Sequence, residues 1–545
     1  MTDRNPTQPS TTADHGYLSH RQILVVLTGL MAGMFLAALD MSIVGTALPR
    51  IVSDLGGLNH LSWVVTAYLL TSTASTPLWG KISDLYGRRP TFQTAIVVFI
   101  AGSLVSALAQ DMPVLIGGRA VQGLGAGGLM ALALSVIGDV IPPRERGRYQ
   151  GYFGAVFGVS TVSGPLLGGW FTDGPGWEWI FWINVPIGLA ALVITSLALK
   201  MPKVRRDHRI DYLGAAVIVA SVTSILLYTA WAGGEFGWAD PFSLALLIGG
   251  VALVGGFVWV ESRAEEPIIP LRLFRNRVFT PTVTFTAIMG LAMFGGIIFL
   301  PVYFQVVQGM SPTASGLAMV PMVAGLFTTS IGSGQLMTRT GRYKIYPIIG
   351  AAVTSIGFLL LTTLDTDTPY WQIAVFIFVL GAGLGFTMQI VVTAVQNAVE
   401  RRDMGSATSS VTFFRTMGGA FGTAVFGAVL TNRLGHYLSQ SGAGADLSAR
   451  GGESDLANNV QAIQALPPQL KEVVLDAWVS AVHDVFLVAL PFAVAAFVLA
   501  FFIPERELRQ AGDAPPDSAP PDSAPPGSEP PDSEPVLARE PGPAG

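Results

Sequence analysis

Fourteen long apolar segments, each close to the length of a membrane-crossing helix, set the strongest limit on how this chain can fold. A helix needs about 20 apolar residues to cross the hydrocarbon core of a bilayer. Backbone polar groups in lipid must be paired within the protein, so uninterrupted apolar runs of this length predict helices. The predicted spans are residues 23–47, 61–79, 92–110, 113–137, 149–171, 180–200, 211–231, 242–260, 280–303, 313–336, 345–364, 371–393, 408–431 and 480–503.

The composition agrees with a lipid environment. Only 12% of the 545 residues are charged and 51% are hydrophobic, whereas soluble proteins have about 25% charged residues. The chain contains no cysteine, which excludes disulfides and thiolate or zinc-thiolate chemistry. The polar segment 1–21 leads into a full-length span without a small-residue cleavage site, so we predict no cleaved signal peptide.

The distribution of Lys and Arg predicts the orientation. The loops on one side, residues 80–91, 138–148, 200–210, 261–278, 337–345 and 397–407, hold twenty of them. The short loops on the other side hold only Arg50. Positive loops face the cytoplasm, so we predict a multi-pass protein of the cytoplasmic membrane with both termini in the cytoplasm.

One short charged loop occurs twice. Gly80 to Pro90 separates spans 2 and 3, and a shift of 254 residues maps Gly80 and Gly87 onto Gly334 and Gly341. We infer a duplicated, all-α integral membrane protein in which spans 1–6 and 9–14 form related halves and spans 7–8 are inserted. The predicted parts are a cytoplasmic tail (1–22), a first half (23–200), two inserted helices with their loops (201–278), a second half (279–505) with a long outer loop (432–479), and a disordered Pro-rich tail (506–545).

Several short motifs follow one another in a characteristic order. They are Asp40–Pro49, Trp63–Tyr68, Gly80–Arg89, Arg119–Gly123, Gly164–Gly169, Asn184–Gly188, Phe299–Gln305 and Phe413–Arg415. Over residues 20–505 the sequence resembles the major facilitator superfamily, in its fourteen-span drug:proton antiporter branch. The resemblance implies two six-helix halves that alternate access to a central cavity. Four positions depart from the usual residues: Ser42, Gly45, Ser160 and Glu178.

Two charged residues lie inside predicted spans at similar depth. Asp40 is nine residues before Pro49 and Arg119 is six residues after Pro113, which places them roughly 13 and 9 Å deep at ~1.5 Å per residue. Burial disfavours a charged carboxyl and a nearby guanidinium favours it. We predict that Asp40, paired with Arg119, carries the proton; the alternative is a permanent ion pair that holds spans 1 and 4 together.

The repeated loop predicts a gate. In the family that the sequence resembles, the acid corresponding to Asp84 faces the N-terminus of span 13, where unpaired N–H groups favour an anion. The predicted gating residues are Gly80, Asp84, Gly87, Arg88, Arg89 and Arg415. Arg415 either extends towards the cytoplasm or joins Asp84. The alternative for the loop is a topology signal with Asp84 solvated.

A glycine- and proline-rich motif in span 5 consists of Gly164, Pro165, Gly168 and Gly169. Small residues allow close helix packing, and proline removes a backbone donor and permits a bend. In the family this is the antiporter motif, at the interface between halves, although packing alone also explains such residues.

The substrate is predicted from the residue types available to line a cavity. The candidates are Phe35, Gln122, Phe294, Phe299, Tyr303, Gln305, Met388, Gln389 and Gln396, and each of them could equally pack between helices. Aromatic, thioether and amide groups suit bulky, partly apolar compounds. Because spans 9, 10, 12 and 13 contain no acid, a neutral or monocationic substrate is favoured over a dication.

These observations predict a proton-coupled exporter of drugs or similar compounds. No phosphate-binding GxxxxGK loop or catalytic constellation is present, and the GxGxxG pattern at 123–128 lies inside a span without a preceding strand. We therefore predict no enzyme, cofactor, metal or nucleic-acid partner, and a monomer that contacts lipid, protons and a small-molecule substrate. The alternatives are an exporter of one self-made metabolite and a membrane scaffold or sensor that works through its Pro-rich tail.

Overall fold

The described part of the chain is built of helices. The computed structural model describes residues 20–55, 61–141, 143–199, 211–231, 237–441, 463 and 466–508. In these residues all regular elements are helical. They are α1 (His20–Leu55), α2 (Leu61–Tyr86), α3 (Arg88–Ala107), α4 (Met112–Val140), α5 (Pro143–Asp173), α6 (Trp179–Trp182), α7 (Asn184–Ala198), α8 (Tyr212–Trp231), α9 (Pro241–Glu261), η2 (Leu271–Arg275), α10 (Phe279–Val306), α11 (Pro312–Ala318), α12 (Val320–Thr340), α13 (Ile345–Leu361), α14 (Tyr370–Ala398), η3 (Arg401–Asp403), α15 (Met404–Gln440) and α19 (Pro468–Ala500).

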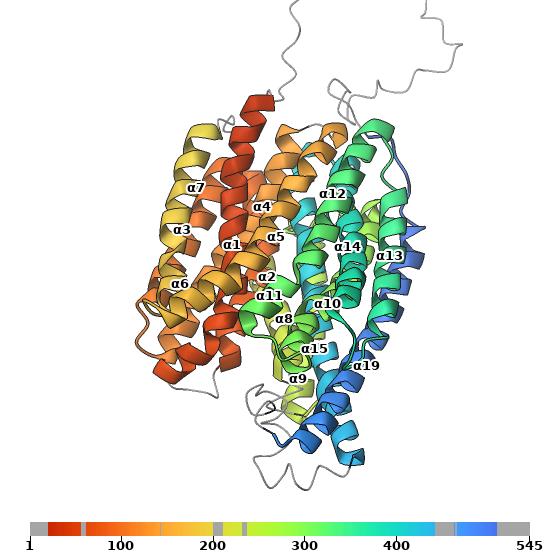
Figure 1. The fold of residues 1–545 in the computed structure, drawn as a ribbon. Coiled ribbons are helices and arrows are strands. Elements are labelled where there is room, and N and C mark those ends of the chain that lie inside the picture. Colours follow the sequence, from red (N-terminus) through yellow and green to blue (C-terminus); the bar gives the residue numbers. More distant parts are fainter. Residues whose placement is uncertain are drawn as a thin grey trace, which may run out of the picture. The chain divides into compact units, whose positions relative to one another are not determined.

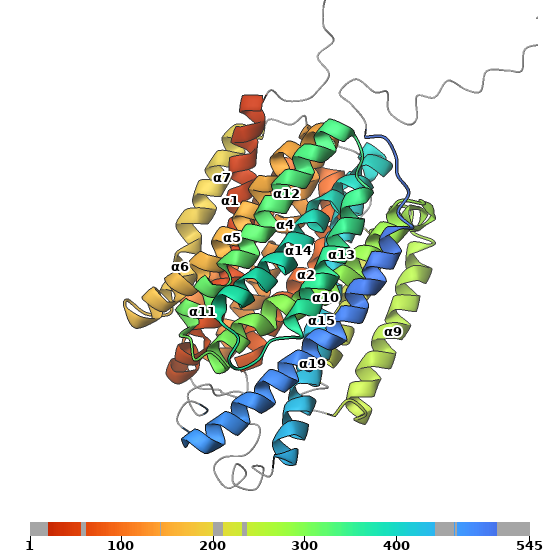
Figure 2. The same cartoon turned by 45° about the vertical axis from the view of Figure 1, so that its right-hand side comes forward.

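Two groups of helices lie side by side. Figure 1 shows α1–α7, in red to yellow, beside α10–α19, in green to blue. The two groups meet where α2 packs on α15 and α5 packs on α12. Helix α8 covers the seam between α2 and α15, where Ile218 and Val222 share an apolar cluster with Phe413. Helix α9 stands at the edge of the bundle (Figure 2).

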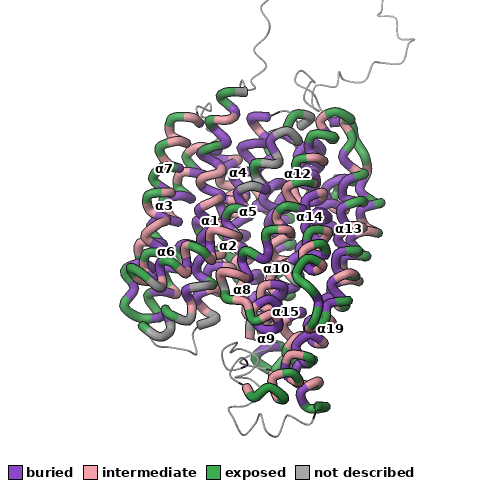
Figure 3. Tube along the Cα trace, viewed as in Figure 1, coloured by how far each residue is buried: buried purple, intermediate pink, exposed green. Residues whose placement is uncertain are grey.

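The helices α4 and α14 occupy the interior of the two groups. Most of their residues are buried, and the tube in Figure 3 is purple along its middle and green on its periphery. An exposed apolar periphery is what a lipid-facing bundle requires. The most exposed large apolar residues include Leu197, Ile248 and Trp371.

Eleven helical segments of the described chain are long and apolar enough to cross a membrane. The prediction of all-helical membrane architecture is thereby confirmed. Three further helices coincide with predicted spans: α13, which is apolar but has 17 residues, and the longer α2 and α5. Helix α2 is less apolar because of its serines and threonines, of which Thr71 and Thr76 donate to carbonyls one turn earlier at 2.9 and 2.7 Å.

Predicted spans 6 and 10 coincide with the membrane-length segments Trp179–Ala198 and Thr313–Thr340, each of which has a break in the helix, at Ile183 and at Met319. The predicted boundaries of the outer loop were wrong. The predicted outer loop 432–479 is helical at both ends, because α15 continues to Gln440 and α19 begins at Pro468. Leu434, Leu438 and Trp478 are buried together there, so apolar packing extends both helices.

The two copies of the repeated loop share a backbone feature. Gly87 has φ +94° and Gly341 has φ +71°, a region that residues with a Cβ rarely adopt. These glycines end α2 and α12 in equivalent places. The end of the bundle that holds Gly87 and Gly341 is called the basic end below.

The predicted tails lie outside the described residues except for 20–22 and 506–508.

Candidate proton-coupling and gating sites

Asp40 on α1 and Arg119 on α4 form a fully buried ion pair. A guanidinium nitrogen of Arg119 lies 2.5 Å from Asp40 Oδ2, and the residues are 0% and 1% exposed. Gln122 Nε2 donates to Asp40 Oδ1 at 2.6 Å, and Gln122 Oε1 accepts from Arg119 at 2.7 Å. Asn184 Nδ2 also donates to Oδ1, at 3.1 Å. The two carboxyl oxygens of Asp40 therefore accept from three donors.

A second layer holds this pair in place. Tyr68 lies under the guanidinium of Arg119, with 4.2 Å from Cζ to the ring centroid, and Arg119 Nε donates to the Val64 carbonyl at 3.2 Å. Ser103 Oγ accepts from Asn184 at 3.0 Å. Sequence reasoning missed the roles of Tyr68, Ser103 and Asn184. Tyr68 and Asn184 belong to the motifs of the resemblance, but nothing in the sequence distinguishes Ser103.

Asp84 at the end of α2 reaches the first turn of α15. Its Oδ1 accepts from the backbone N–H of Gly405 at 3.0 Å, and its Oδ2 accepts from the N–H and Oγ of Ser406 at 2.8 and 3.0 Å. Arg88 lies 2.6 Å from Asp84 Oδ1. A carboxylate at a helix N-terminus satisfies donors that have no partner within the helix. The contact joins the two halves at the basic end.

Arg88 and Gly80 support this contact. Arg88 donates from Nε to Asp139 Oδ2 at 2.6 Å, so it ties the α2–α3 turn to α4. A Cβ on Gly80 would lie 2.6 Å from Ser409 Cβ and 2.8 Å from the Gly405 carbonyl oxygen, which means that only glycine permits this approach of α2 and α15. Arg89 is half-buried on α3 and forms none of the described contacts between the halves.

A second link between the halves, which sequence reasoning missed, joins Arg146 to Gln396. Arg146 on α5 donates to Gln396 Oε1 at 2.9 Å. Gln396 on α14 donates to the Leu134 carbonyl at 2.9 Å and to Thr408 Oγ1 at 3.1 Å. All four groups lie at helix ends of the basic end. Four helices of both halves, α4, α5, α14 and α15, therefore meet at one buried amide.

We expect Gln396→Leu to lower the melting temperature of the purified protein. The substitution keeps an apolar stem of similar size but removes three buried hydrogen bonds, to Arg146, the Leu134 carbonyl and Thr408, each worth about 0.5–1.5 kcal/mol. Gln372→Leu on the same helix is the control, since the Gln372 side chain has no hydrogen bond to a described residue. Equal melting temperatures for the two variants would contradict the prediction.

The glycine–proline motif of α5 lies between helices of both halves. Gly164 packs on α1, where a Cβ would lie 2.7 Å from Ser42 Cβ. Pro165 faces α11, because a Cβ on Gly316 would lie 2.9 Å from its ring. Gly169, also on α5, lies near Thr313 of α11, and Gly168 of α5 is buried. The motif thus touches α1 close to Asp40 and the second half at the same time.

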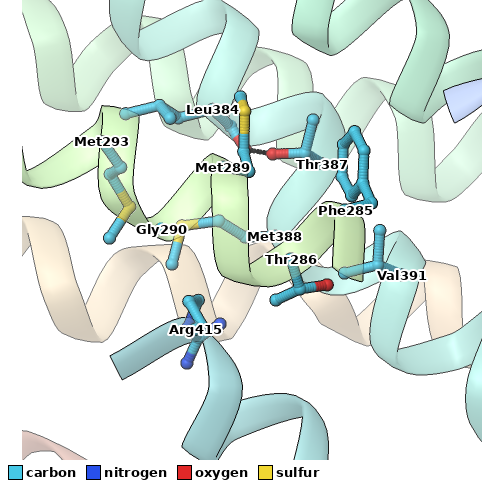
Figure 4. Close-up of a pocket in the computed structure, with 10 residues that line it drawn as sticks. All are labelled: Phe285, Thr286, Met289, Gly290, Met293, Leu384, Thr387, Met388, Val391 and Arg415. Carbon is cyan, nitrogen blue, oxygen red and sulfur yellow. Dashed lines mark hydrogen bonds between the residues drawn. The ribbon is translucent and has the colours of Figure 1, made fainter. Parts of the chain in front are cut away.

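The residues predicted to line a cavity lie in several different places in the structure. Met388 is the one candidate among the residues that line the small pocket of Figure 4. Gln122 binds the Asp40–Arg119 pair and Gln396 lies at the basic end, so their amide groups are occupied elsewhere. Tyr303 donates to the Asp365 carbonyl at 3.0 Å and Gln305 to Ser315 Oγ at 3.0 Å. The remaining candidates, Phe35, Phe294, Phe299 and Gln389, pack between helices as half-buried or buried side chains.

Arg415 does not join Asp84, contrary to one of the two expectations for it. It lies on α15 at the pocket between α10 and α14, together with Met289, Met293 and Met388. Its backbone carbonyl touches α10 at Gly290. Its side chain forms no hydrogen bond or ion pair with the described residues. Among the gating residues predicted from the sequence, Arg415 therefore belongs to a different place in the molecule.

The sequence of this chain matches the model of a known protein family. The model of the Major Facilitator Superfamily matches residues 30–423. The chain belongs to the major facilitator superfamily. It is a transporter of that family rather than an enzyme, as the sequence predicted.

Proteins similar to this chain include one that is named as a multidrug transporter. An uncharacterized MFS-type transporter of Mycobacterium tuberculosis is 41% identical over 515 residues, which cover 93% of this chain and 74% of the relative. The multidrug transporter protein MdtP of Bacillus subtilis is 41% identical over 426 residues, 78% of each chain. The solved structure of the proton:xylose symporter XylE matches with a TM-score of 0.55 at 15% identity, over 90% of this chain and 98% of that one. That likeness shows the fold alone.

Proposed function

We propose that this transporter exports hydrophobic or amphiphilic compounds across the cytoplasmic membrane in exchange for protons. The observation that carries the proposal is the fully buried Asp40 carboxyl group, which accepts hydrogen bonds from three donors. A buried ionisable group in a membrane span is costly, about 2.5–3.5 kcal/mol or more, and marks an ion or substrate path. The name of the relative MdtP supports drug-like substrates.

The proposed coupling follows from the donors around Asp40. Protonation neutralises the carboxyl and removes the charge that pairs with the guanidinium of Arg119, so it weakens the contact between α1 and α4. Because the donors come from α4 and α7, this change alters packing around α1. Gly164 contacts α1 two residues from Asp40 and Pro165 contacts α11 of the other half. The glycine–proline motif is thus the proposed mechanical link between protonation and rearrangement of the halves.

In the proposed cycle the basic end faces the cytoplasm. Fourteen spans result if α2, α5 and α13 cross the membrane together with the eleven apolar segments, and an even number leaves both termini on one side. The Asp84 contact and the Arg146–Gln396 contact then close the cytoplasmic side. Export requires both contacts to break when the cavity opens inward.

The experiment that tests the function is pH-driven uptake of a panel of dyes and antibiotics into inside-out proteoliposomes of the full-length chain. We expect uptake of several chemically different compounds when the lumen is acidic, and none after the gradient is collapsed. Uptake of only one compound of the panel would favour the alternative of an exporter for a single metabolite. Absence of transport for the whole panel would reject the proposal.

A deletion separates the scaffold or sensor alternative. Residues 511–545 contain the repeated Pro-Pro-Asp-Ser pattern, and a transporter needs only its helical bundle. We expect the chain truncated after residue 510 to keep at least half of the pH-driven transport of the full chain. Loss of all cellular effect with intact transport would instead assign the biological role to the tail.

A further inference from the structure

Two arginines away from the basic end, Arg119 and Arg415, have opposite surroundings. Arg119 has a carboxylate, an amide oxygen and a backbone carbonyl as acceptors. Arg415 begins the fourth turn of α15, eleven residues after Met404, or ~16 Å along the helix. It has no acceptor among the described residues. Charged groups at such depth normally pair with another protein group or with what the path carries.

The pocket beside Arg415 is apolar and adaptable. Figure 4 shows Arg415 at one edge, with Met293 and Met388 near it and Phe285 and Val391 on the far side. The remaining lining residues are Thr286, Met289, Gly290, Leu384 and Thr387. Methionine side chains are unbranched and polarizable, so they change rotamer at low cost to admit ligands of different shapes.

The charge of this pocket has one sign. Arg415 is the only titratable residue among the lining residues, and the buried Asp40 carboxyl group is paired with Arg119. The cavity has a volume of about 20 Å³, while one water needs about 10–15 Å³. With the contacts of the basic end formed, the pocket therefore has room for about one water and must widen to admit a substrate.

We propose that Arg415 and this methionine-lined pocket form the subsite for the anionic group of the substrate, and that the exported compounds include amphiphilic organic anions. The proposal rests on the proposed export function and makes its substrate class specific. An anion supplies the acceptor that Arg415 lacks, and the apolar wall receives the body of the same molecule. An organic cation would add a second unpaired positive charge to the site, so it is disfavoured. This reverses the sequence expectation of a neutral or monocationic substrate.

The test uses three probes with the same apolar body: naphthalene-2-sulfonate, naphthalene-2-sulfonamide and 2-naphthyltrimethylammonium. We expect the full-length purified chain to bind the sulfonate at least tenfold more tightly than either of the other two. Arg415→Gln should remove this preference, whereas Arg415→Lys should keep part of it. Arg433→Gln is the matched control on the same helix. Arg433 does not line the pocket, and its Nε lies 3.2 Å from Asp484 Oδ2.

The melting temperature of each purified variant shows whether it is folded and whether it binds the sulfonate. We expect Arg415→Gln to be at least as stable as the parent, since it removes a charge without a described partner, and the sulfonate to raise the melting temperature of the parent but not of the variant. Chloride at the same concentration should give no such rise. An equal rise with chloride would show a site for any small anion, and an unchanged sulfonate preference in Arg415→Gln would overturn the proposal.

The outcomes distinguish this subsite from the export function. If proteoliposomes accumulate the sulfonamide or the ammonium compound in a pH-dependent way but bind the sulfonate no better, the anion subsite is wrong and export stands. If the sulfonate binds through Arg415 but no compound of the broader panel moves with the pH gradient, the subsite stands and proton-driven export is wrong.

Discussion

Purified Asp40→Asn is expected to lose all uphill transport driven by a pH gradient while retaining substrate binding. An amide cannot alternate between charged and neutral forms, so a cycle that moves one proton on this side chain stops. Exchange of labelled for unlabelled substrate does not require net proton transfer and should survive. The measurement is pH-driven uptake, equilibrium exchange and binding on one preparation in proteoliposomes. Intact uphill transport would remove Asp40 from the proton path.

The structure makes the competing explanation testable. If the Asp40–Arg119 pair only holds α1 and α4 together, Asp40→Asn leaves a buried guanidinium without its counter-ion, and the loss of stability is of order 3–5 kcal/mol. The double variant Asp40→Asn/Arg119→Gln removes both charges. A structural pair predicts that the double variant regains stability and transport together. A proton carrier predicts that stability returns and pH-driven transport does not.

The sequence predicted the positions of charged groups better than the positions of neutral ones. A carboxyl and a guanidinium inside apolar spans are rare and costly, so Asp40 and Arg119 could be paired by their matched depth and by the place of spans 1 and 4 in the fold that the sequence resembles. The repeated loop drew attention to Asp84, and the resemblance to a known family implied its contact with the N-terminus of a helix in the second half. The glutamines were different: Gln122 and Gln396 were predicted in a cavity, but each has a buried acceptor or donor nearby that only the three-dimensional packing reveals.

In the fold, too, the sequence predicted some features, and tertiary packing decided the others. Long apolar runs predicted the helices, and the helix ends were shifted where tertiary packing decided them. Helix α15 extends to Gln440 because Leu434 and Leu438 bury against α19, and the Tyr437 hydroxyl donates to Asp484 at 2.8 Å. The Arg146–Gln396 contact spans 250 residues of sequence. No local pattern carries such a pairing, whereas the resemblance to a known family implied the partner of Asp84.

The Asp84→Asn variant is expected to open the basic end and to slow transport at least tenfold. The substitution keeps the size of the side chain but removes the charge that the α15 N-terminus favours, an interaction of roughly 0.3–2 kcal/mol. It also leaves Arg88 with Asp139 alone as carboxylate partner. Because the contact crosses from α2 to α15, its loss should shift the population towards the state in which the halves are apart at this end.

A cysteine probe reports this opening directly, since the chain contains no cysteine of its own. Ser409 is fully buried against Gly80, so Ser409→Cys should react slowly with a membrane-impermeant maleimide applied at the basic end. Adding Asp84→Asn should speed the reaction several-fold. Asp139→Asn is the matched control, because it also removes a carboxylate from Arg88 but lies on α4 within the first half. If Asp139→Asn speeds labelling and slows transport as much as Asp84→Asn does, the effect belongs to the Arg88 charge network, and the Asp84 contact with α15 is not the gate.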